Sequence, residues 1–453
     1  MTECNQTVFA FEGHFSRQVE ARFDGAQMTT DGGVLLLRAV DRQIGLLKRV
    51  AACFRDARDP ERVEHALPEL LAQRIYALAL GYEDLNDHEE LRRDPLLGLL
   101  AGKRDLEEPL AGKSTLNRLE LTPAGAPQNQ RYHKITYSAG ALDALLVEIF
   151  LEAHPQPPGE VVLDLDVTDT PLHGEQEARF FHGYYGHYCY LPLYIFCGEH
   201  LLCARLRPSN QDASAGSVEE VERIVRQVRG RWPGVRMVLR ADAGFCREEL
   251  MVWCENNDVD YVFGLARNSR LRRKIAAPLR EAKQEQRRTG KAVRRFTEFF
   301  YRTRKSWSRA RRVVAKAEYL EKGENPRFVV TSLDAAARPA QELYERFYCA
   351  RGEMENRIKE QLRLFSDRLS TETLRANQLR LYFSSLAYVL MHALRRLGLR
   401  GTEWATAQVE TIRLRLLKIA AEVRLTARRI WVRYSHAYPW KALFAAAYAA
   451  LSG

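Results

Sequence analysis

Three separated stretches of the sequence each place a carboxylate in a setting suited to metal chemistry. Asp166 lies within one apolar run, Asp242 directly follows another, and Glu355 lies in a stretch with helical spacing. Carboxylates from separate segments that meet at one point can hold two Mg²⁺ ions about 3.5–4 Å apart, one to activate a nucleophile and one to stabilise a leaving oxygen. The sequence therefore predicts a metal-dependent phosphoryl-transfer site with Asp166, Asp242 and Glu355 as catalytic residues and metal ligands.

The first stretch contains a second acidic residue. Asp164 and Asp166 lie two positions apart, so both side chains face the same side of a β-strand. Burying carboxylates in an otherwise apolar strand is costly unless they are paired or bind a metal. Asp164 is therefore a further candidate metal ligand, and the competing interpretation is an aspartate that caps a turn at the end of the strand.

The setting of Asp242 allows two interpretations. It follows the predicted strand 235–239, and Gly244 and Phe245 lie two and three residues after it. Sites in open α/β sheets form at the carboxyl ends of strands, which favours a functional aspartate. An aspartate before a helix is also a common N-cap, so capping alone is the alternative.

Around the third carboxylate, charged and aromatic residues share one stripe of a predicted helix over 340–363. Tyr348, Arg351, Glu355 and Lys359 are spaced at i, i+3, i+7 and i+11. A ladder of surface salt bridges would produce the same pattern. The functional interpretation is a metal ligand beside a DNA phosphate that the arginine and the lysine contact.

The elements that position these residues follow an α/β pattern. The expected order is β-β-β-α-β-α-β, which is that of a ribonuclease-H-like fold. The predicted strands are 161–167, 190–197, 201–206, 235–239 and 261–263, and the predicted helices are 218–228 and 248–255.

The fold class is therefore α/β, a ribonuclease-H-like catalytic core interrupted by a basic β-rich insertion, with helical N-terminal and C-terminal regions. The insertion is dense in Arg and Lys and contains strand-like stretches at 296–301 and 313–319. We expect five regions: a mainly helical DNA-binding region at 1–150, the first part of the core at 151–268, the insertion at 269–325, the second part of the core with the glutamate helix at 326–370, and a C-terminal helical region at 371–453.

The composition narrows the partners. A formal net charge of +11 suits an anionic polymer such as DNA, because Lys and Arg release counterions when they contact phosphates. No apolar run reaches membrane-spanning length, so no membrane partner is expected. The eight cysteines form no C-x-x-C pair and no secretory signal is visible, which favours a cytoplasmic protein with reduced thiols.

The three carboxylate stretches together resemble the DDE transposases of bacterial insertion sequences. Tyr348, Arg351 and Glu355 match the Y-x2-R-x3-E signature, and VLRADAGF around Asp242 and LDLDVTDT around Asp166 are similar to the other two blocks. The stretches TTDGGVLLLRAVDRQIGL, HGEQE and HGYYGHYCYLPL resemble insertion-sequence family 1380. The signature places a lysine seven residues after the glutamate, where this chain has Leu362, and Lys359 is the candidate replacement.

The resemblance implies a transposase that binds terminal inverted repeats and performs metal-dependent strand cleavage and strand transfer. The cofactor would be Mg²⁺, with Mn²⁺ as the alternative ion. Its partners would be double-stranded terminal and target DNA and a second copy of the chain in a synaptic homodimer, with the protein associated with the bacterial nucleoid. In some relatives a tryptophan of the insertion stacks on a flipped base, which makes Trp307 a candidate, and a core tryptophan is the alternative. Two other functions stay open: a nuclease that does not transpose, and a transposase-derived DNA-binding regulator.

Overall fold

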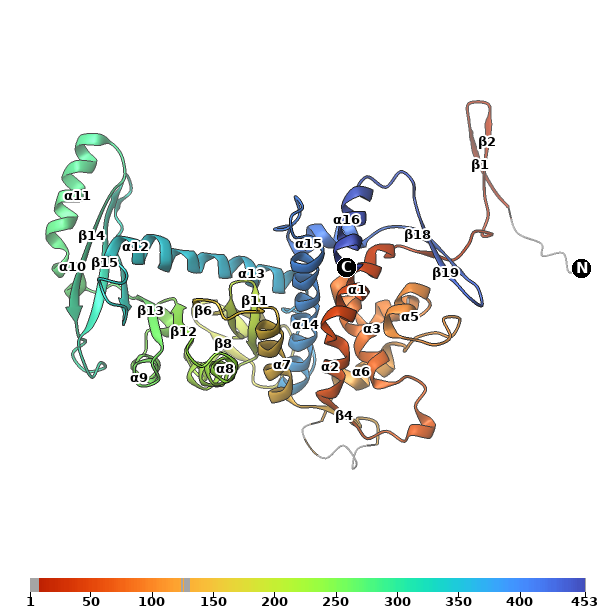
Figure 1. Cartoon of the computed structure of the whole chain (residues 1–453), viewed down its shortest axis with the longest axis horizontal. Helices are drawn as coiled ribbons and strands as arrows, with labels where there is room; N and C mark the ends of the chain where they lie inside the picture. The colour runs from red at the N-terminus through yellow and green to blue at the C-terminus, as the bar shows by residue number, and fades with distance from the viewer. Residues whose placement is uncertain (1–7, 124, 126–130, 453) are drawn as a thin grey trace, which may run out of the picture. The chain divides into compact units, whose positions relative to one another are not determined.

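In the computed structural model of the chain, which describes residues 8–123, 125 and 131–452, the candidate residues lie on or beside a nine-stranded mixed sheet (Figure 1). The strand order is β11-β10-β6-β12-β13-β17-β15-β14, and the short β16 pairs with β15. β6, β12 and β13 are parallel to one another, whereas the other neighbours pair antiparallel. The strands are β6 (Glu160–Val167), β10 (Leu193–Cys197), β11 (His200–Arg205), β12 (Arg236–Ala241), β13 (Asp260–Leu265), β14 (Val293–Tyr301), β15 (Arg311–Leu320), β16 (Gly323–Glu324) and β17 (Arg327–Thr331).

Three helices cover one face of this sheet. They are α7 (Ala139–Glu152), α8 (Ser217–Arg231) and α9 (Glu248–Asn256). Because side chains alternate along a strand, Val161, Leu163 and Leu165 of β6 all point into the core beneath these helices. Asp164 and Asp166 belong to the alternate set, so the same alternation directs them to the opposite face.

A single helical segment covers that opposite face. It begins as α12 (Ala340–Glu342), continues as the π-helix η6 (Leu343–Tyr348) and the 3-10 turn η7 (Cys349–Arg351), and ends as α13 (Gly352–Arg363). Leu343, Tyr344 and Phe347 pack on valines of β12, β13, β15 and β17. The predicted helix over 340–363 is present, but its winding changes three times, from α-helix to π-helix, to a 3-10 turn and back to α-helix.

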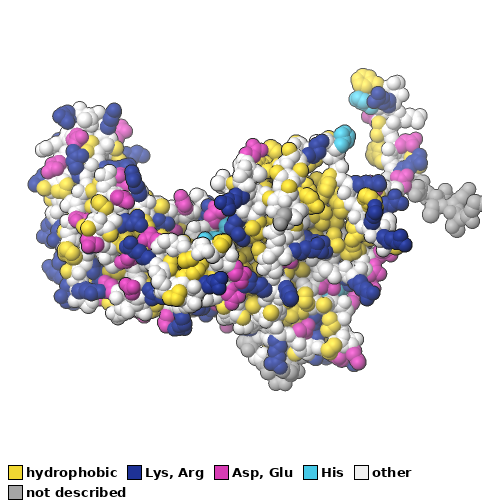
Figure 2. Space-filling model, viewed as in Figure 1, with side chains coloured by type: hydrophobic (Ala, Val, Ile, Leu, Met, Phe, Trp, Pro, Cys, Tyr) yellow, Lys and Arg dark blue, Asp and Glu magenta, His cyan; other side chains and the backbone are white. Residues whose placement is uncertain are grey.

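Residues 269–325 begin with two helices before the strands start. α10 (Ser269–Lys274) and α11 (Ala276–Thr289) come first, and α11 contacts both β14 and β15. The strand-like stretches expected at 296–301 and 313–319 lie within β14 and β15, and these strands extend the central sheet. Figure 2 shows many Lys and Arg side chains over this part of the molecule.

The chain separates into two compact units, and the sheet lies in the one formed by 44–63 and 117–392. The other unit comprises 1–43, 64–116 and 393–453. Its elements include β3 (Met28–Thr29), α1 (Leu35–Ile44), α3 (Leu67–Leu80), α4 (His88–Leu91), α5 (Pro95–Ala101), α15 (Val409–Ile412), β18 (Ala421–Leu425), β19 (Ile430–Tyr434) and α16 (Lys441–Ser452). The unit of the sheet also contains α2 (Leu46–Ala52), β4 (Phe54–Asp56) and β5 (Ile135–Tyr137). Two helices, α6 (Lys113–Glu120) and α14 (Leu374–Gly398), have residues in both units.

The ends of the chain depart from the helical prediction. The region 1–150, expected to be mainly helical, contains the antiparallel hairpin of β1 (Phe9–His14) and β2 (Arg17–Ala21). The C-terminal region, expected to be helical, contains the antiparallel hairpin β18–β19, and β18 also pairs with β3. Its sequence alternates apolar and polar residues with the period of two that a half-buried strand requires, so hydrophobic content alone misled the helix prediction.

Pro95 separates two helices of the other unit. α4 ends at Leu91, and Pro95 occupies the first turn of α5, where the Asp94 side chain accepts hydrogen bonds from Leu96 N and Leu97 N at 2.8 and 3.0 Å. Proline fits the first helical turn because the N–H it lacks would have no partner within the helix. None of the helices in the described ranges combines the length and apolar character that crossing a bilayer requires.

Candidate active site

Asp166 and Asp242 lie at the same end of two neighbouring parallel strands. Ala241 is paired with Leu165 in the register of β12 and β6, so each aspartate comes one residue after a paired position. The structure thus brings together two side chains that are 76 residues apart in sequence. The convergence follows from the parallel pairing, because the carboxyl ends of parallel strands share one edge of the sheet.

The helical segment brings Arg351 and Glu355 to this edge. Arg351 Nη1 donates to Asp166 Oδ2 at 2.9 Å, and Arg351 Nη2 donates to Glu355 Oε1 at 3.3 Å. The Glu355 side chain is 56% exposed, whereas that of Asp166 is 15% exposed. Arg351 therefore acts as the counter-ion that joins the first and third carboxylates.

The electrostatics of Asp166 show that all three carboxylates influence one another. Burial raises the pKa of Asp166 to about 6. The Arg351 guanidinium opposes this shift, while the negative charges of Asp242 and Glu355 add to it. Like charges that crowd a half-buried position are expensive without a cation, and the arginine supplies one here.

Asp242 also caps the short 3-10 turn η5 (Ala243–Phe245). Its Oδ1 accepts a hydrogen bond from Gly244 N at 2.8 Å. The capping role that the sequence left open is therefore present in the structure. It occupies one carboxylate oxygen and fixes the orientation of the side chain.

Tyr348 lies in the same cluster, in contact with the loop that follows Asp242. A Cβ on Gly264 would lie 2.6 Å from the Tyr348 hydroxyl and 2.8 Å from Ala243 N, so only glycine fits between them. Burial raises the pKa of Tyr348, and the neighbouring Arg351 lowers it while Asp242 raises it. Because a 3-10 turn has three residues per turn, η7 places Tyr348 and Arg351 on the same side.

Asp164 occupies a different environment. It is 5% exposed and forms a bidentate ion pair with Arg240 of β12, at 2.6 and 2.7 Å. Arg240 Nη1 also donates to the Phe347 carbonyl at 2.6 Å, which ties the sheet to the π-helix. Burial raises the pKa of Asp164 and the hydrogen bonds from Arg240 oppose it. The structure thus uses Asp164 in a buried ion pair and leaves Asp166 at the edge beside Asp242.

Of the other predicted residues, Lys359 lies on the exposed side of α13 and Trp307 does not reach solvent. The Trp307 side chain is 5% exposed and packs edge-on against Tyr301, with a ring-centroid distance of 5.8 Å. The Arg311 guanidinium lies 5.5 Å from its ring centroid. Trp307 therefore occupies the core position that the sequence left as the alternative, because the loop before β15 folds back onto the sheet.

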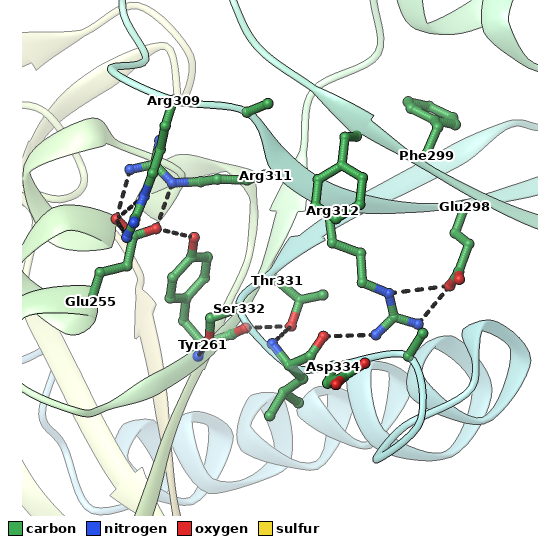
Figure 3. A pocket seen from close by; sticks show the side chains of 14 residues that line it. Glu255, Tyr261, Glu298, Phe299, Arg309, Arg311, Arg312, Thr331, Ser332 and Asp334 are labelled. Atoms are coloured by element: carbon green, nitrogen blue, oxygen red, sulfur yellow. Dashed lines mark hydrogen bonds and ion pairs between the residues drawn. The ribbon is translucent and has the colours of Figure 1, made fainter.

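The arginines at the start of β15 face a pocket of about 710 Å³ rather than the carboxylate cluster (Figure 3). Arg311 pairs with Glu248 and Glu255 at 2.6 and 2.7 Å, and Arg312 pairs with Glu298 at 2.6 Å. The sequence shows Arg311 and Arg312 only as members of the basic insertion, and it gives no indication of their glutamate partners. The available signal was that both arginines lie at the start of an apolar strand.

The donor set at the edge suits a hard cation, although its present arrangement is ion-paired. Mg²⁺ prefers carboxylate oxygens, which Asp166, Asp242 and Glu355 supply. Within residues 8–123, 125 and 131–452, no three His, Cys, Asp or Glu side chains are already grouped closely enough to hold a metal ion. Arg351 fills the cationic role between two of the three carboxylates. The residues therefore fit the ion by chemistry, and binding would require Arg351 to release them.

Comparison with known proteins gives a family match over nearly the whole chain. The family model described as transposase DDE domain group 1 matches residues 11–453. A cryo-EM structure of a piggyBac transposase synaptic complex with hairpin DNA resembles the chain with a TM-score of 0.42 and 10% sequence identity, covering 86% of this chain and 80% of that one. No curated protein matches the chain.

Proposed function

The chain belongs to the transposase DDE domain group 1 family, and from this premise we propose that it binds the terminal inverted repeats of a bacterial insertion sequence of family 1380 and transposes it. The reaction would be hydrolysis of a DNA strand to free a 3′ hydroxyl, followed by attack of that hydroxyl on target DNA. The observation that carries this proposal is the clustering of Asp166, Asp242, Arg351 and Glu355 at one edge of the sheet.

We assign the catalytic metal ligands to Asp166, Asp242 and Glu355 and leave Asp164 to its pair with Arg240. Bound Mg²⁺ or Mn²⁺ would supply Lewis-acid stabilisation of the charge that develops on the phosphate. Support for this assignment comes from the pKa of Asp166, which burial raises and the negative charges of Asp242 and Glu355 raise further, since a bound cation would relieve both effects.

Tyr348, Arg351 and Lys359 would contact the DNA backbone. Arg351 has the planar set of donors that binds a phosphate with two hydrogen bonds. When Arg351 binds a DNA phosphate, it would leave Asp166 and Glu355, so substrate binding would free these carboxylates for the metal ion. Tyr348 lies between Gly264 and Arg351 and would fix the direction of this contact.

We interpret β11-β10-β6-β12-β13 as the ribonuclease-H-like core and residues 269–325 as its insertion. The supporting feature is the order of these five strands, in which β6, β12 and β13 are parallel and β10 and β11 follow on one side through antiparallel pairings. The regions 1–150 and 371–453 would contribute DNA contacts and helical support. A homodimer would hold two element ends together in the cytoplasm, associated with the nucleoid.

The proposal is tested with DNA from the ends of the element that encodes this chain and a target plasmid. We expect wild-type protein with Mg²⁺ to give both cleaved ends and strand-transfer products. Asp242→Asn should lower both by about 10³-fold or more, because the loss of a member of a catalytic unit removes most of the rate enhancement. Asp258→Asn, at a turn away from the cluster, is the matched control.

Three outcomes would overturn the proposal. Cleaved ends without joined products would identify a nuclease that does not transpose. Unchanged transposition by Asp242→Asn would remove the catalytic assignment, and specific binding without any cleavage by the wild type would identify a regulator.

A further inference from the structure

Aromatic side chains gather at the tip of a hairpin that closely follows the strand of Asp166. The hairpin consists of β8 (Phe180–His182) and β9 (His187–Tyr190), and β9 pairs with β7 (Thr170–Pro171). Phe181, Tyr184 and Tyr188 are 57%, 86% and 44% exposed. Large aromatic rings rarely gather on an exposed tip without a binding role. The proposed function gives this stretch, HGYYGHYCY, no role.

The tip lies close to the acidic edge of the sheet. Burial raises the pKa of Tyr185 to about 12, and the negative charges of Asp169 and Asp166 raise it further. His187 Nε2 lies 2.7 Å from Asp169 Oδ2, which attaches β9 to the residues that follow β6. A ligand on this tip would therefore be a neighbour of the strand that Asp166 acts on.

The hairpin is held in one conformation. Cys189 and Tyr190 are buried at its base, and Ser209 Oγ donates to the Phe180 carbonyl at 2.9 Å. Gly186, with a φ of 75°, closes the turn, and its N–H donates to the His182 carbonyl at 2.8 Å. The rings are supported from below, because Tyr184 and His182 lie 5.0 and 4.9 Å from Tyr185 between ring centroids.

The charge around the tip favours a neutral, flat ligand over a phosphate. Asp166 and Asp169 make the adjacent surface acidic, and the nearby Arg179 already pairs with Glu175 at 2.6 Å while its guanidinium lies 4.7 Å from the Tyr188 ring centroid. Nucleobases are flat and uncharged, and they stack on exposed aromatic rings when they are unpaired. Bases within a duplex are covered on both faces and cannot do so.

We propose that the β8–β9 tip, with Tyr184 as its outermost ring, stacks the nucleobase of an unpaired nucleotide next to the strand that is cleaved. This proposal rests on the proposed function, because it takes DNA as the substrate of the neighbouring carboxylates. It locates the base contact on the core of the protein, whereas Trp307 of the insertion is buried.

The test compares a blunt duplex with the same duplex carrying a short single-stranded tail that contains 2-aminopurine. We expect wild-type full-length protein to bind the tailed duplex about tenfold more tightly and to quench the 2-aminopurine fluorescence. Tyr184→Ala should abolish most of this preference and the quenching, while Tyr184→Phe, which keeps the ring, retains both. Phe300→Ala removes an aromatic ring that is 72% exposed on β14, outside the regions assigned to DNA contacts, and should change neither.

Three results for Tyr184→Ala would overturn the inference. The variant could keep its preference for the tailed duplex, or lose affinity equally for both duplexes. It could also keep the preference and change its self-association, measured by sedimentation. The last result would mean that a protein partner covers the tip. Strand cleavage of terminal DNA, measured on the same samples, separates the two proposals. If the wild type cleaves DNA and Tyr184→Ala still prefers the tailed duplex, only the stacking role of the β8–β9 tip is refuted. If the wild type does not cleave DNA, the proposed function is refuted.

Discussion

Arg351 and Arg240 perform related tasks in different surroundings. Arg351 neutralises Asp166 and Glu355 at the open edge, and Arg240 neutralises Asp164 beneath the π-helix. An ion pair with an exposed partner, as between Arg351 and Glu355, contributes little to stability, but a buried pair such as Arg240 and Asp164 leaves an uncompensated charge when one partner is removed. The two arginines should therefore differ in their effect on folding, with Arg240 mainly structural and Arg351 available for substrate.

Arg240→Met should destabilise the protein by about 3–5 kcal/mol, because Asp164 would stay buried without a cation. The double variant Arg240→Met with Asp164→Leu removes both charges and should recover most of this loss. Thermal unfolding followed by circular dichroism measures both. A single variant as stable as wild type, or a double variant no better than the single one, would contradict a structural role for the pair.

Glu255 provides a pH-dependent test of the arginines at the start of β15. Burial on its own would raise its pKa, but hydrogen bonds from Arg311 and Arg309 outweigh burial and lower the pKa below its ordinary value of 4.5. A carboxyl group whose pKa is lower in the folded state stabilises the protein fully above the unfolded value, and this stabilisation is lost as the pH falls through the folded value.

We therefore expect wild type to exceed Glu255→Gln in stability at neutral pH by about 1–3 kcal/mol, the usual contribution of a charged hydrogen bond. The difference between the two Tm values should narrow as the pH falls below about 4.5. Glu249→Gln, an exposed change on the same helix α9, should show no such difference at any pH. A difference in Tm between wild type and Glu255→Gln that widens as the pH falls would refute the stabilising role of the ionised Glu255.

At the level of elements, the change from π-helix to 3-10 turn explains how one helix reaches two parts of the site. A π-helix adds a residue to a turn, and such segments occur often at functional sites. Here η6 seats Leu343 and Phe347 on the sheet, and η7 then directs Tyr348 and Arg351 to the edge. A regular α-helix would rotate the second set of residues away from that edge.

Gly264→Ala tests this contact between helix and sheet. Its Cβ would meet the Tyr348 hydroxyl at 2.6 Å and Ala243 N at 2.8 Å, so both Tyr348 and the loop after Asp242 must shift. We expect DNA cleavage to fall about 10²-fold, since small displacements of positioning groups have effects of this size, while binding of duplex DNA changes little.

Adding Tyr348→Phe to Gly264→Ala should restore only part of the cleavage rate, because the contact with the Ala243 backbone remains. Gly290→Ala is not a suitable control, since Gly290 has a φ of 68° that disfavours alanine. Gly230→Ala on α8 has open space around it and no positive φ, and should leave cleavage unchanged. Equal cleavage by wild type and Gly264→Ala would show that the site does not depend on this close packing.

The N-terminal motif TTDGG also has a structural explanation at this scale. A Cβ on Gly33 would lie 1.9 Å from the Leu416 carbonyl oxygen, and Gly32 N donates to the Ile419 carbonyl at 2.8 Å. Asp31 accepts a hydrogen bond from the Tyr82 hydroxyl and pairs with Lys418, both at 2.8 Å. The motif therefore connects the N-terminal segment to the segments around Tyr82 and 416–419 within the unit of 1–43, 64–116 and 393–453.

For the whole molecule, the net charge of +11 and the acidic edge of the sheet have opposite electrostatic effects on DNA. Lys and Arg on the surface attract the duplex, whereas the carboxylates repel its phosphates until a cation intervenes. Binding and cleavage should consequently respond differently to ions.

Chelation of divalent metal with EDTA should abolish strand cleavage and leave duplex binding largely intact, and added Mg²⁺ or Mn²⁺ should restore cleavage. Raising monovalent salt from about 50 to 200 mM should instead weaken binding about 10³–10⁵-fold if six to ten phosphates are contacted. Electrophoretic mobility shift and cleavage assays on one DNA measure both. Cleavage that persists in EDTA, or binding that ignores salt, would contradict this division.

The sequence by itself determined the elements around the candidate site. Local alternation and apolar periodicity predicted the strands of Asp166 and Asp242 and the helix of Glu355, because these patterns follow from local geometry. The transposase family follows from the same motifs. The C-terminal hairpin β18–β19 was mispredicted as helix, since hydrophobic content suits more than one kind of element.

Only the tertiary structure decided which charges meet. Asp164 and Asp166 face the same side of β6, and the sequence does not show which cation each one meets. In the structure, Arg240 of the neighbouring strand pairs with Asp164, and Arg351 of the helical segment pairs with Asp166. Burial of Trp307 and the pairing of Arg311 with Glu255 likewise depend on contacts between segments far apart in the chain. The energy of a charge depends on its surroundings and partners in space, which the order of residues does not contain.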